Sequence, residues 1–407
     1  MDNSKSSILK EAHDIVSQCD RCGTCLPACP LFGIKDVEAV SARGKNNITR
    51  ALAEGGLEPS GDILKAVNFC LLCRSCTDIC PNKLKTDVAM MAVRQHLADR
   101  SGGAGLKYSA LGGLLKNKNL VKLSAGMLGV VRKVGLGGLV PYGMAPAGGS
   151  RRQYLAAFAG PAALGGQAPV AAAPVVKGGK VAYFQGCGMR MMFPEVVKET
   201  LAILGTTGEV LQADNECCGL PHLAHGLRAD FLAMAKENIR LFTQADVIVS
   251  DCASCSGTLK HLGEYLAGDP DWKDKAAAFS AKVMSLSEYL AKVGYRPRQH
   301  TEARITFHEP CHLGRGQGVK KQPRELLKAA GNYVEMAGAD VCCGGAGSFH
   351  TDYPEVAAAV LAKKQAAIEK TGAQVAVTEC PVCLVQLTKA AAASGGKFRA
   401  LHLSQVL

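Results

Sequence analysis

The chain has 407 residues, and at about 150 residues per domain this length predicts two or three domains with buried cores. Hydrophobic residues make up 48% and charged residues 20%, a balance that is typical of globular proteins and excludes a disordered one. The formal net charge is +12, but the excess lies between Arg100 and Arg190, where there is no Asp or Glu. With 5% aromatic residues and a basic excess confined to one segment, we expect no nucleic-acid partner.

Cysteine is the unusual residue, with 18 copies. A chain of this length builds a core without disulfide bonds, so the cysteines need another explanation. The first residues, MDNSKSSILKEAHD, have no apolar segment of the secretory type, and we therefore expect a cytoplasmic location. In a reducing compartment, so many thiols indicate metal ligands.

The first 100 residues contain the motif C-x2-C-x2-C-x3-C-P twice. This run is typical of bacterial ferredoxins, where three cysteines hold one [4Fe–4S] cluster and the fourth ligates the other cluster. We therefore predict two cubane clusters with crossed ligands, one on Cys19, Cys22, Cys25 and Cys80, and one on Cys70, Cys73, Cys76 and Cys29. Zinc is the alternative for sulfur ligands in fours, but zinc sites use two separated pairs.

Helix-forming segments separate the two motifs. SARGKNNITRALAEGG ends in glycines after an apolar face, and DILKAVNFC leads into the second motif. Residues 1–100 are therefore predicted to form a helical two-cluster ferredoxin domain.

Residues 101–178 are predicted to form a basic helical bracket and an Ala/Gly/Pro-rich linker. Within them, 105–140 has the pattern of one or two basic amphipathic helices broken by glycine. This element could pack the two halves of the protein together, or it could dock on a membrane surface or a partner. Residues 153–176 carry no charge, but prolines and glycines interrupt them, which favours a linker over a transmembrane helix.

The rest of the chain is an internal duplication, with one repeat at 179–295 and the other at 302–407. Each repeat has one cysteine, then an adjacent pair, then C-x-x-C, and VAYFQGC (181–187) matches ITFHEPC (305–311). Strands alternating with helices predict an α/β fold in each repeat, with the cysteines at the strand ends where such sheets bind ligands. The overall class is therefore α+β. The candidate metal ligands are Cys187, Cys217, Cys218, Cys252 and Cys255 in the first repeat, and Cys311, Cys342, Cys343, Cys380 and Cys383 in the second.

Five cysteines exceed what a cubane cluster requires, so a distorted or opened cluster could use the fifth sulfur. The alternative is one cubane or zinc site per repeat with a spare thiol. Five histidines near the cysteines either tune such a cluster or are ordinary structural groups; they are His222, His225, His308, His312 and His350.

Over nearly its whole length the chain resembles the cysteine-rich "CCG-domain" iron–sulfur proteins, through the two ferredoxin motifs and the sequences CCGLPH and CCGGAGSFH. Two branches are similar in layout: the iron–sulfur subunit of glycolate or D-lactate oxidases, and the catalytic subunit of heterodisulfide reductases. The resemblance implies one noncubane [4Fe–4S] cluster on the five cysteines of each repeat. Some members of the oxidase branch have lost cysteines here, whereas this chain keeps all ten.

The resemblance implies an oxidoreductase subunit that transfers electrons for a flavin-dependent 2-hydroxyacid dehydrogenase acting on glycolate or D-lactate. A separate FAD-containing subunit would oxidise the acid, and a quinone or another carrier would accept the electrons. The alternative is a subunit of the heterodisulfide reductase type that reduces a disulfide at its noncubane clusters. The basic segment adds the expectation of peripheral contact with the cytoplasmic face of a membrane.

Overall fold

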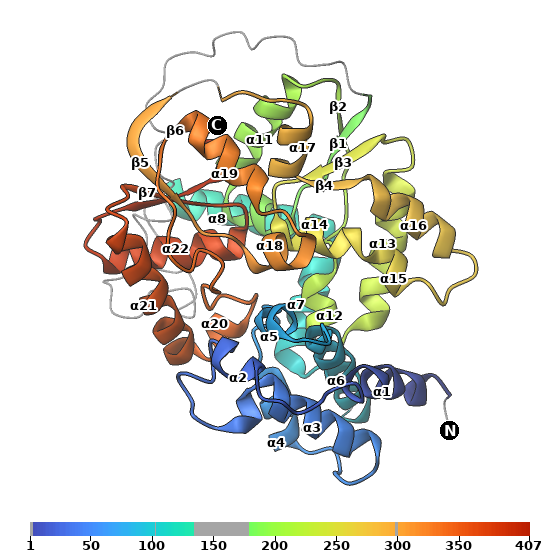
Figure 1. Ribbon diagram of the computed structural model, residues 1–407. Helices are drawn as coiled ribbons and strands as arrows, with labels where there is room; N and C mark the ends of the chain where they lie inside the picture. Colours follow the sequence, from blue (N-terminus) through green and yellow to red (C-terminus); the bar gives the residue numbers. More distant parts are fainter. Residues whose placement is uncertain (1–2, 102, 134–178, 298–299) are drawn as a thin grey trace.

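The computed structural model describes residues 3–101, 103–133, 179–297 and 300–407 (Figure 1). The predicted linker at 153–176 and the end of the basic segment, 134–140, lie outside these residues. Helices of the first hundred residues form one end of the molecule, and two α/β units form the other (Figure 1). The predicted α+β class, with a helical N-terminal part and a duplicated α/β part, is confirmed.

The N-terminal part is helical, and side-chain caps start two of its helices. Ser41 accepts a hydrogen bond from the backbone N–H of Gly44 at 3.2 Å, and Ser60 accepts one from Ile63 at 3.3 Å. Nearly every residue of the central helix α6 is buried, because α1, α3 and α4 pack around it. The bounds are α1 (Asn3–Val16), α2 (Cys25–Ala28), α3 (Ala42–Ala53), α4 (Gly61–Asn68), α5 (Ser75–Ile79) and α6 (Thr86–Arg100).

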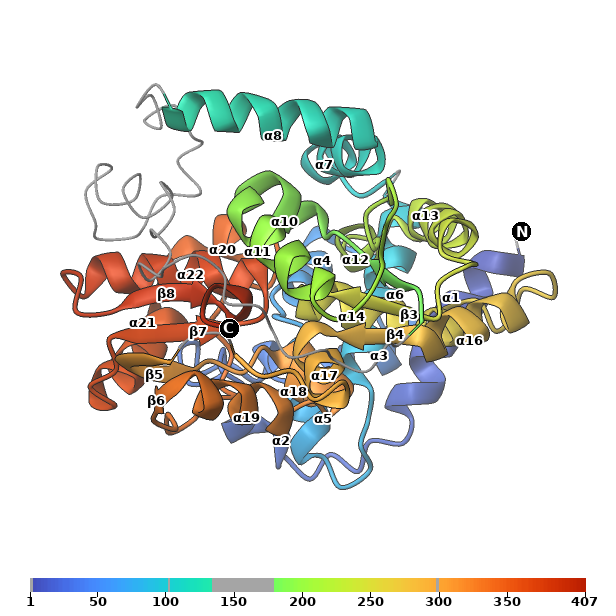
Figure 2. The same cartoon turned by 90° about the horizontal axis from the view of Figure 1, so that it is seen from above.

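The basic segment forms two helices, α7 (Leu106–Lys116) and α8 (Lys118–Lys133), and Figure 2 shows α8 lying over α10 of the first repeat. The prediction that glycine breaks them is wrong. The break falls at Asn117, whose side chain accepts hydrogen bonds from the first N–H groups of α8. Gly112 instead lies inside α7, where a Cβ would stand 2.7 Å from Leu227 of the first repeat, so glycine allows close packing.

The two repeats have the same four-stranded parallel sheet. The strand order is β2-β1-β3-β4 in the first repeat and β6-β5-β7-β8 in the second. The central strands β1 and β7 are short, apolar and buried on both faces, as parallel strands covered by helices must be. The strands are β1 (Val181–Tyr183), β2 (Val210–Gln212), β3 (Val247–Ser250), β4 (Val283–Ser285), β5 (Thr301–Phe307), β6 (Gly331–Tyr333), β7 (Val375–Thr378) and β8 (Arg399–His402).

The helices of the repeats also correspond. In the first repeat they are α10 (Cys187–Met192), α11 (Pro194–Gly205), α12 (Leu220–Ala224), α13 (Arg228–Leu241), α14 (Ala253–Lys260), α15 (Leu262–Tyr265), α16 (Lys273–Lys282) and α17 (Leu286–Lys292). In the second repeat they are α18 (Cys311–Gln317), α19 (Lys321–Ala330), α20 (Phe349–Asp352), α21 (Pro354–Lys370) and α22 (Pro381–Ala393). A capping box follows the last strand of each repeat, on Ser285 and on His402, so the internal duplication extends to local detail.

The repeats pack against each other through a shared apolar core. One buried cluster contains Tyr183 and Val249 from the first sheet together with Phe307 and Val377 from the second. The order of each sheet reverses between its two central strands, and a cysteine follows both of them. Because ligands of open α/β sheets bind at this switch point, the fold places both cysteine groups where a cofactor is expected.

Candidate metal centres

All 18 cysteines are free thiols, and they gather in four groups. Groups A and B lie in the N-terminal part, with A made of Cys19, Cys22, Cys25 and Cys80 and B made of Cys29, Cys70, Cys73 and Cys76. Groups C and D are the five cysteines of the first and second repeats. Sets of four and five soft sulfur donors without disulfide bonds fit iron–sulfur clusters.

Group A surrounds a small cavity of about 30 Å³. Cys19, Cys22 and Cys25 come from one loop, while Cys80 reaches the cavity from the end of α5. Arg43 of α3 lies beside this group and is held by Glu38 at 2.6 Å. A cation is therefore fixed next to thiols that would carry negative charge as ligands.

Group B brings the last cysteine of the first motif to the three leading cysteines of the second. The negative charges of Cys70 and Cys73 both act on Cys29, and burial is the main reason why the pKa of the Cys29 thiol is raised. Burial raises the pKa of Cys76 as well, with further contributions from Cys73 and Cys70. Cys29 therefore lies near cysteines of the second motif, and the crossed ligation of groups A and B stays a prediction.

The loops that carry groups A and B share an unusual backbone conformation, with positive φ angles on both sides of the second cysteine. Arg21 (φ 56°) and Leu72 (φ 50°), each just before the second cysteine of its motif, both have left-handed conformations. Gly23 (φ 84°) and Arg74 (φ 61°), each just after that cysteine, do too. Such strain in non-glycine residues is concentrated at functional sites, and alternation of this kind turns successive N–H groups toward an anionic group.

Group C lies at the ends of β1 and β3 and in the loop before α12. The Sγ atoms of Cys187 and Cys217 are 3.3 Å apart, and the Sγ of Cys252 accepts a hydrogen bond from the backbone N–H of Cys255. Hydrogen bonds from the thiols of Cys217 and Cys255 lower the pKa of Cys218 to about 5. The site therefore favours a thiolate at the second cysteine of the adjacent pair.

Group D repeats this arrangement in the second sheet. The Sγ atoms of Cys343 and Cys383 are 3.6 Å apart, and the backbone N–H of Gly344 donates to the Sγ of Cys342 at 3.4 Å. Hydrogen bonds from Cys342 and Cys383 hold the pKa of Cys343 well below its usual range. Hydrogen bonds from Cys252 and Cys383 likewise hold the pKa of Cys380 well below its usual range, so group D favours thiolates at both positions.

Groups B, D and C contact one another in that order, and Cys76 of group B lines the cavity of group A. Cys73 of group B interacts through its thiol with Cys342 of group D, and this contact raises the pKa of Cys73. Cys252 of group C interacts in the same way with Cys380 of group D. Ser254 lies beside this second contact, with its Oγ 3.5 Å from the Sγ of Cys380. No spacing in the sequence indicated these two contacts.

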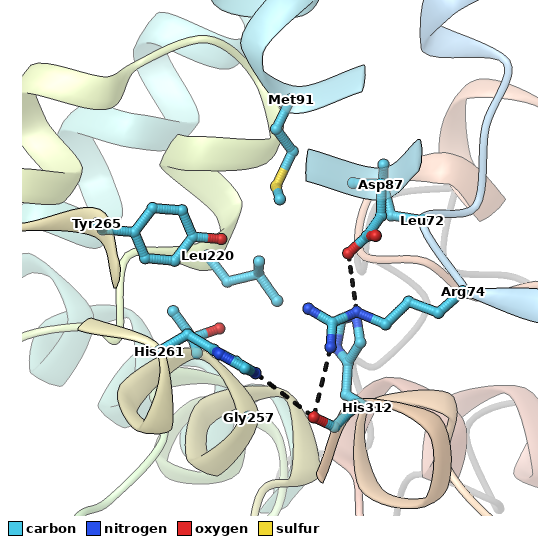
Figure 3. A pocket seen from close by; sticks show the side chains of 11 residues that line it. Leu72, Arg74, Asp87, Met91, Leu220, Gly257, His261, Tyr265 and His312 are labelled. Atoms are coloured by element: carbon cyan, nitrogen blue, oxygen red, sulfur yellow. Dashed lines mark hydrogen bonds and ion pairs between the residues drawn. The ribbon is translucent and has the colours of Figure 1, made fainter. Parts of the chain in front are cut away.

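A small cavity of about 20 Å³ lies where the N-terminal part meets both repeats (Figure 3). Arg74, from the loop of group B, pairs with Asp87 of α6 at 2.8 Å and donates to the carbonyl of Gly316 in α18 at 3.4 Å. His261 of the first repeat also lies 3.4 Å from that carbonyl (Figure 3). The cavity has room for about one water molecule, and its polar lining ties the three modules together.

Buried cations near the thiols were missed by the sequence analysis. Lys45 is 1% exposed, and its Nζ donates to the carbonyl of Val40 at 2.5 Å within reach of the charges of group B. Lys364 of α21 is similarly buried near group D and donates to the carbonyl of Gly338 at 2.6 Å. The sequence could have indicated that Lys45 is buried, because it lies on the same face of the predicted helix as Thr49 and Leu52.

The five histidines fall into two kinds. Four have hydrogen-bond partners in the protein, as the ordinary structural interpretation expects: His222 with Gly112, His225 with Ser348, His312 with Ser254, and His350 with Gly345. Neither ring nitrogen of His308 has a hydrogen-bond partner among the described residues, although both are buried. Burial lowers its pKa to about 3, so the ring is neutral.

Four lysines of α7 and α8, namely Lys107, Lys116, Lys118 and Lys122, pair with acidic groups of the protein. Lys116 pairs with Asp230 at 2.5 Å, and Lys122 pairs with Asp214 at 2.8 Å. Lys107 pairs with Asp352 of the second repeat. These contacts favour the bracket interpretation, since the basic helices are bound to both repeats.

Comparisons with known proteins agree with this organisation. The cysteine-rich domain family (CCG) matches residues 181–260 and 305–388, and the 4Fe-4S dicluster domain family matches residues 15–84. The probable glycolate oxidase iron-sulfur subunit of Bacillus subtilis is 29% identical over 96% of this chain and 92% of its own length. Lactate utilization protein A of Oceanobacillus iheyensis is 30% identical, covering 56% of this chain and 96% of that protein. A subunit of the fumarate reductase (CoM/CoB) of Methanothermobacter marburgensis is 25% identical over 96% of this chain and 71% of that protein.

Fold, cysteine pattern and relatives together define an iron–sulfur protein of the oxidoreductase class. The chain belongs to the CCG-domain iron–sulfur protein family, with a dicluster ferredoxin part and two cysteine-rich repeats. No helix among the described residues is long and apolar enough to cross a membrane.

Proposed function

We propose that the chain is the electron-transfer subunit of a flavin-dependent 2-hydroxyacid dehydrogenase acting on glycolate or D-lactate. In this proposal, a FAD-containing partner oxidises the acid, and a quinone or another carrier receives the electrons. The observation that carries it is the series of cysteine groups B, D and C, linked by the Cys73–Cys342 and Cys252–Cys380 contacts, with Cys76 of group B lining the cavity of group A. The names of the Bacillus and Oceanobacillus relatives support hydroxyacid oxidation as the reaction served.

The cysteine groups are proposed as the ligands of four clusters, with cubanes in residues 1–100 and noncubane [4Fe–4S] clusters in 179–295 and 302–407. Residues 101–178 would be the bracket and linker. When bound, such clusters supply one-electron carriers whose potentials depend on nearby charge and hydrogen bonds to sulfur. The protein contributes fixed cations for this purpose, namely Arg43 beside group A, Lys45 beside group B and Lys364 beside group D.

Iron content tests the cluster assignment. Anaerobically purified protein should hold about sixteen iron atoms if all four groups bind [4Fe–4S] clusters, and about eight if only groups A and B do. Zinc in place of iron would contradict the proposal. Cys343→Ser should remove iron from group D alone, whereas a protein with an unaltered iron content would contradict the assignment of that group.

Disulfide reduction is the second candidate function. It is favoured by the direct contact between groups C and D and by the retention of all ten cysteines, which together bring two five-cysteine sites to one place. Thiol formation from a disulfide, driven by a low-potential donor without any 2-hydroxyacid or flavoprotein, would favour this function over the first.

A cytoplasmic location with peripheral membrane contact is also proposed, but the contact is now attributed to exposed apolar side chains instead of to the basic charge. Four lysines of α7 and α8 are paired with acids of the protein, but Leu120, Leu123 and Met127 are exposed on α8, the last two at 60% and 63%. Contact with a lipid surface would therefore use this apolar stripe. Vesicle flotation should weaken in Leu123→Ser and not in Leu241→Ser, an exposed leucine on α13; equal binding by both variants would contradict this contact.

A further inference from the structure

The two repeats differ at one position beside their cysteine groups. Phe184 follows β1, and His308 follows β5 at the matching place, three residues before the first cysteine of each repeat. The backbone is the same in both cases, because the N–H of Phe184 donates to Val249 at 2.8 Å and the N–H of His308 donates to Val377 at 2.8 Å. The same fold therefore presents an apolar ring to group C and an imidazole to group D.

Their surroundings suit the phenylalanine and leave the histidine unpaired. Phe184 is fully buried in an apolar cluster, with its ring centroid 5.8 Å from that of Phe242. His308 is 1% exposed, and neither ring nitrogen makes a hydrogen bond of normal geometry among the described residues, although the backbone of Ala339 lies close enough to act on its pKa. Leaving a buried donor unpaired is costly, so a partner for this ring is expected.

The ring lies where a ligand of group D would be. One nitrogen of His308 and the Sγ atoms of Cys343 and Cys383 all lie within 4.8 Å of one another. Group D already has five cysteine sulfurs, which is more than a four-iron cluster requires. His308 is therefore not needed as an iron ligand. A neutral imidazole still carries one N–H group, and sulfur atoms bound to iron accept hydrogen bonds.

We propose that His308 donates an N–H hydrogen bond to a sulfur atom of the cluster in group D, and thereby makes that cluster easier to reduce than the cluster in group C. This inference rests on the proposed function, since it needs a cluster in the second repeat. The helices that cover the two sites differ in the same direction, because α21 supplies the buried cation Lys364 and α13 supplies the neutral Asn238. Both differences favour extra negative charge on group D.

The test exchanges the two residues in the full-length, cluster-loaded protein. His308→Phe copies the first repeat, Phe184→His copies the second, and His308→Asn keeps an N–H donor. Reduction potentials of the clusters are measured by EPR-monitored titration, and protein labelled with ¹⁵N-histidine is examined for hyperfine coupling to the reduced cluster. We expect a lower potential for group D in His308→Phe, partial recovery in His308→Asn, and a nitrogen coupling that is absent from His308→Phe.

Two controls separate this inference from the proposed function. If the Cys380→Ser variant holds as much iron as the wild type, group D binds no cluster. The proposed function itself then fails. His308→Phe with full iron content, an unchanged potential and an unchanged nitrogen coupling would overturn the role of His308 alone. If His308→Phe loses the cluster, the nitrogen coupling in labelled wild-type protein decides, and its absence would overturn the inference.

Discussion

Arg94 of α6 connects the N-terminal part to the first repeat, and replacing it should loosen this junction. Its side chain is buried, and Nη1 donates to the carbonyl of Ala224 at 2.9 Å. Nη2 donates to the carbonyls of Val67, Asn68 and Cys70 at 3.1, 3.2 and 3.1 Å. The guanidinium thus caps the C-terminal end of α4, where a cation is favoured by the helix dipole, and fixes the start of the second ferredoxin motif.

The contacts set the magnitude of the effect. Arg94→Met leaves four carbonyls without their donor, and each hydrogen bond from a charged group contributes about 1.5–3 kcal/mol. Nη2 divides its two hydrogens among three acceptors, and the substitution also relieves the burial of a charge, so the contributions do not add fully. We expect a net loss of about 3 kcal/mol in the local free energy of opening, which is roughly a 100-fold change in the opening equilibrium.

Hydrogen exchange measured by mass spectrometry tests this expectation at the right place. Amides in residues 67–70 and 222–226 should exchange roughly 100-fold faster in Arg94→Met than in the wild type. Amides of β7 (Val375–Thr378) should exchange at the wild-type rate and serve as the internal control. Arg94→Lys, which keeps the charge but offers one donor atom, should lie between the two. Exchange rates within threefold of the wild type at 67–70 would refute the proposed clamp.

Three further predictions concern the N-terminal part and the first repeat. Cys29→Ser should alter the EPR signal of the cluster in group B, whereas Cys22→Ser should alter that of group A; the reverse outcome would contradict crossed ligation. Gly44→Ala should lower stability by about 1–3 kcal/mol in thermal unfolding, because the added Cβ would stand 2.2 Å from a backbone carbonyl, while Gly113→Ala in open space should not lower it. Burial lowers the pKa of His225 to about 4 in the folded protein, below its ordinary value of 6.5. Between these two values the unfolded chain binds more protons than the folded one, so the free energy of unfolding is unaffected by His225 above about pH 6.5 and decreases as the pH falls toward 4. His225→Phe should therefore lose less melting temperature than the wild type between pH 7 and 4.5, and equal losses would contradict this assignment.

Much of the fold could be predicted because the duplication repeats local patterns. Apolar runs ending on a cysteine predicted the central strands, and β1 and β5 lie where VAYFQGC and ITFHEPC placed them. The helix predicted at PEVVKETLAILG is α11 (Pro194–Gly205), with proline at its first turn and glycine at its end. Strand and helix periodicity are local properties, so they are readable without tertiary structure.

The contacts between cysteine groups could not be predicted in this way. Cys73 and Cys342 belong to different modules, and their contact depends on how α5 and α18 pack, which no spacing encodes. The position of the helix break was also missed, because the capping side chain of Asn117 outweighed the glycines nearby. His308 was visible in the sequence, but its unpaired ring nitrogens are a property of the packed structure alone.

The central claim is that 2-hydroxyacid oxidation reduces the clusters of this chain through a flavoprotein partner. The most direct measurement is anaerobic spectroscopy of the chain copurified with a FAD-containing 2-hydroxyacid dehydrogenase, after addition of D-lactate or glycolate. We predict bleaching of the iron–sulfur absorption and a reduced-cluster EPR signal, and a weaker signal with undiminished flavin reduction when Cys25→Ser and Cys343→Ser are combined. Clusters that stay oxidised while the flavin is reduced by the acid, in a complex that retains full iron content, would contradict the account.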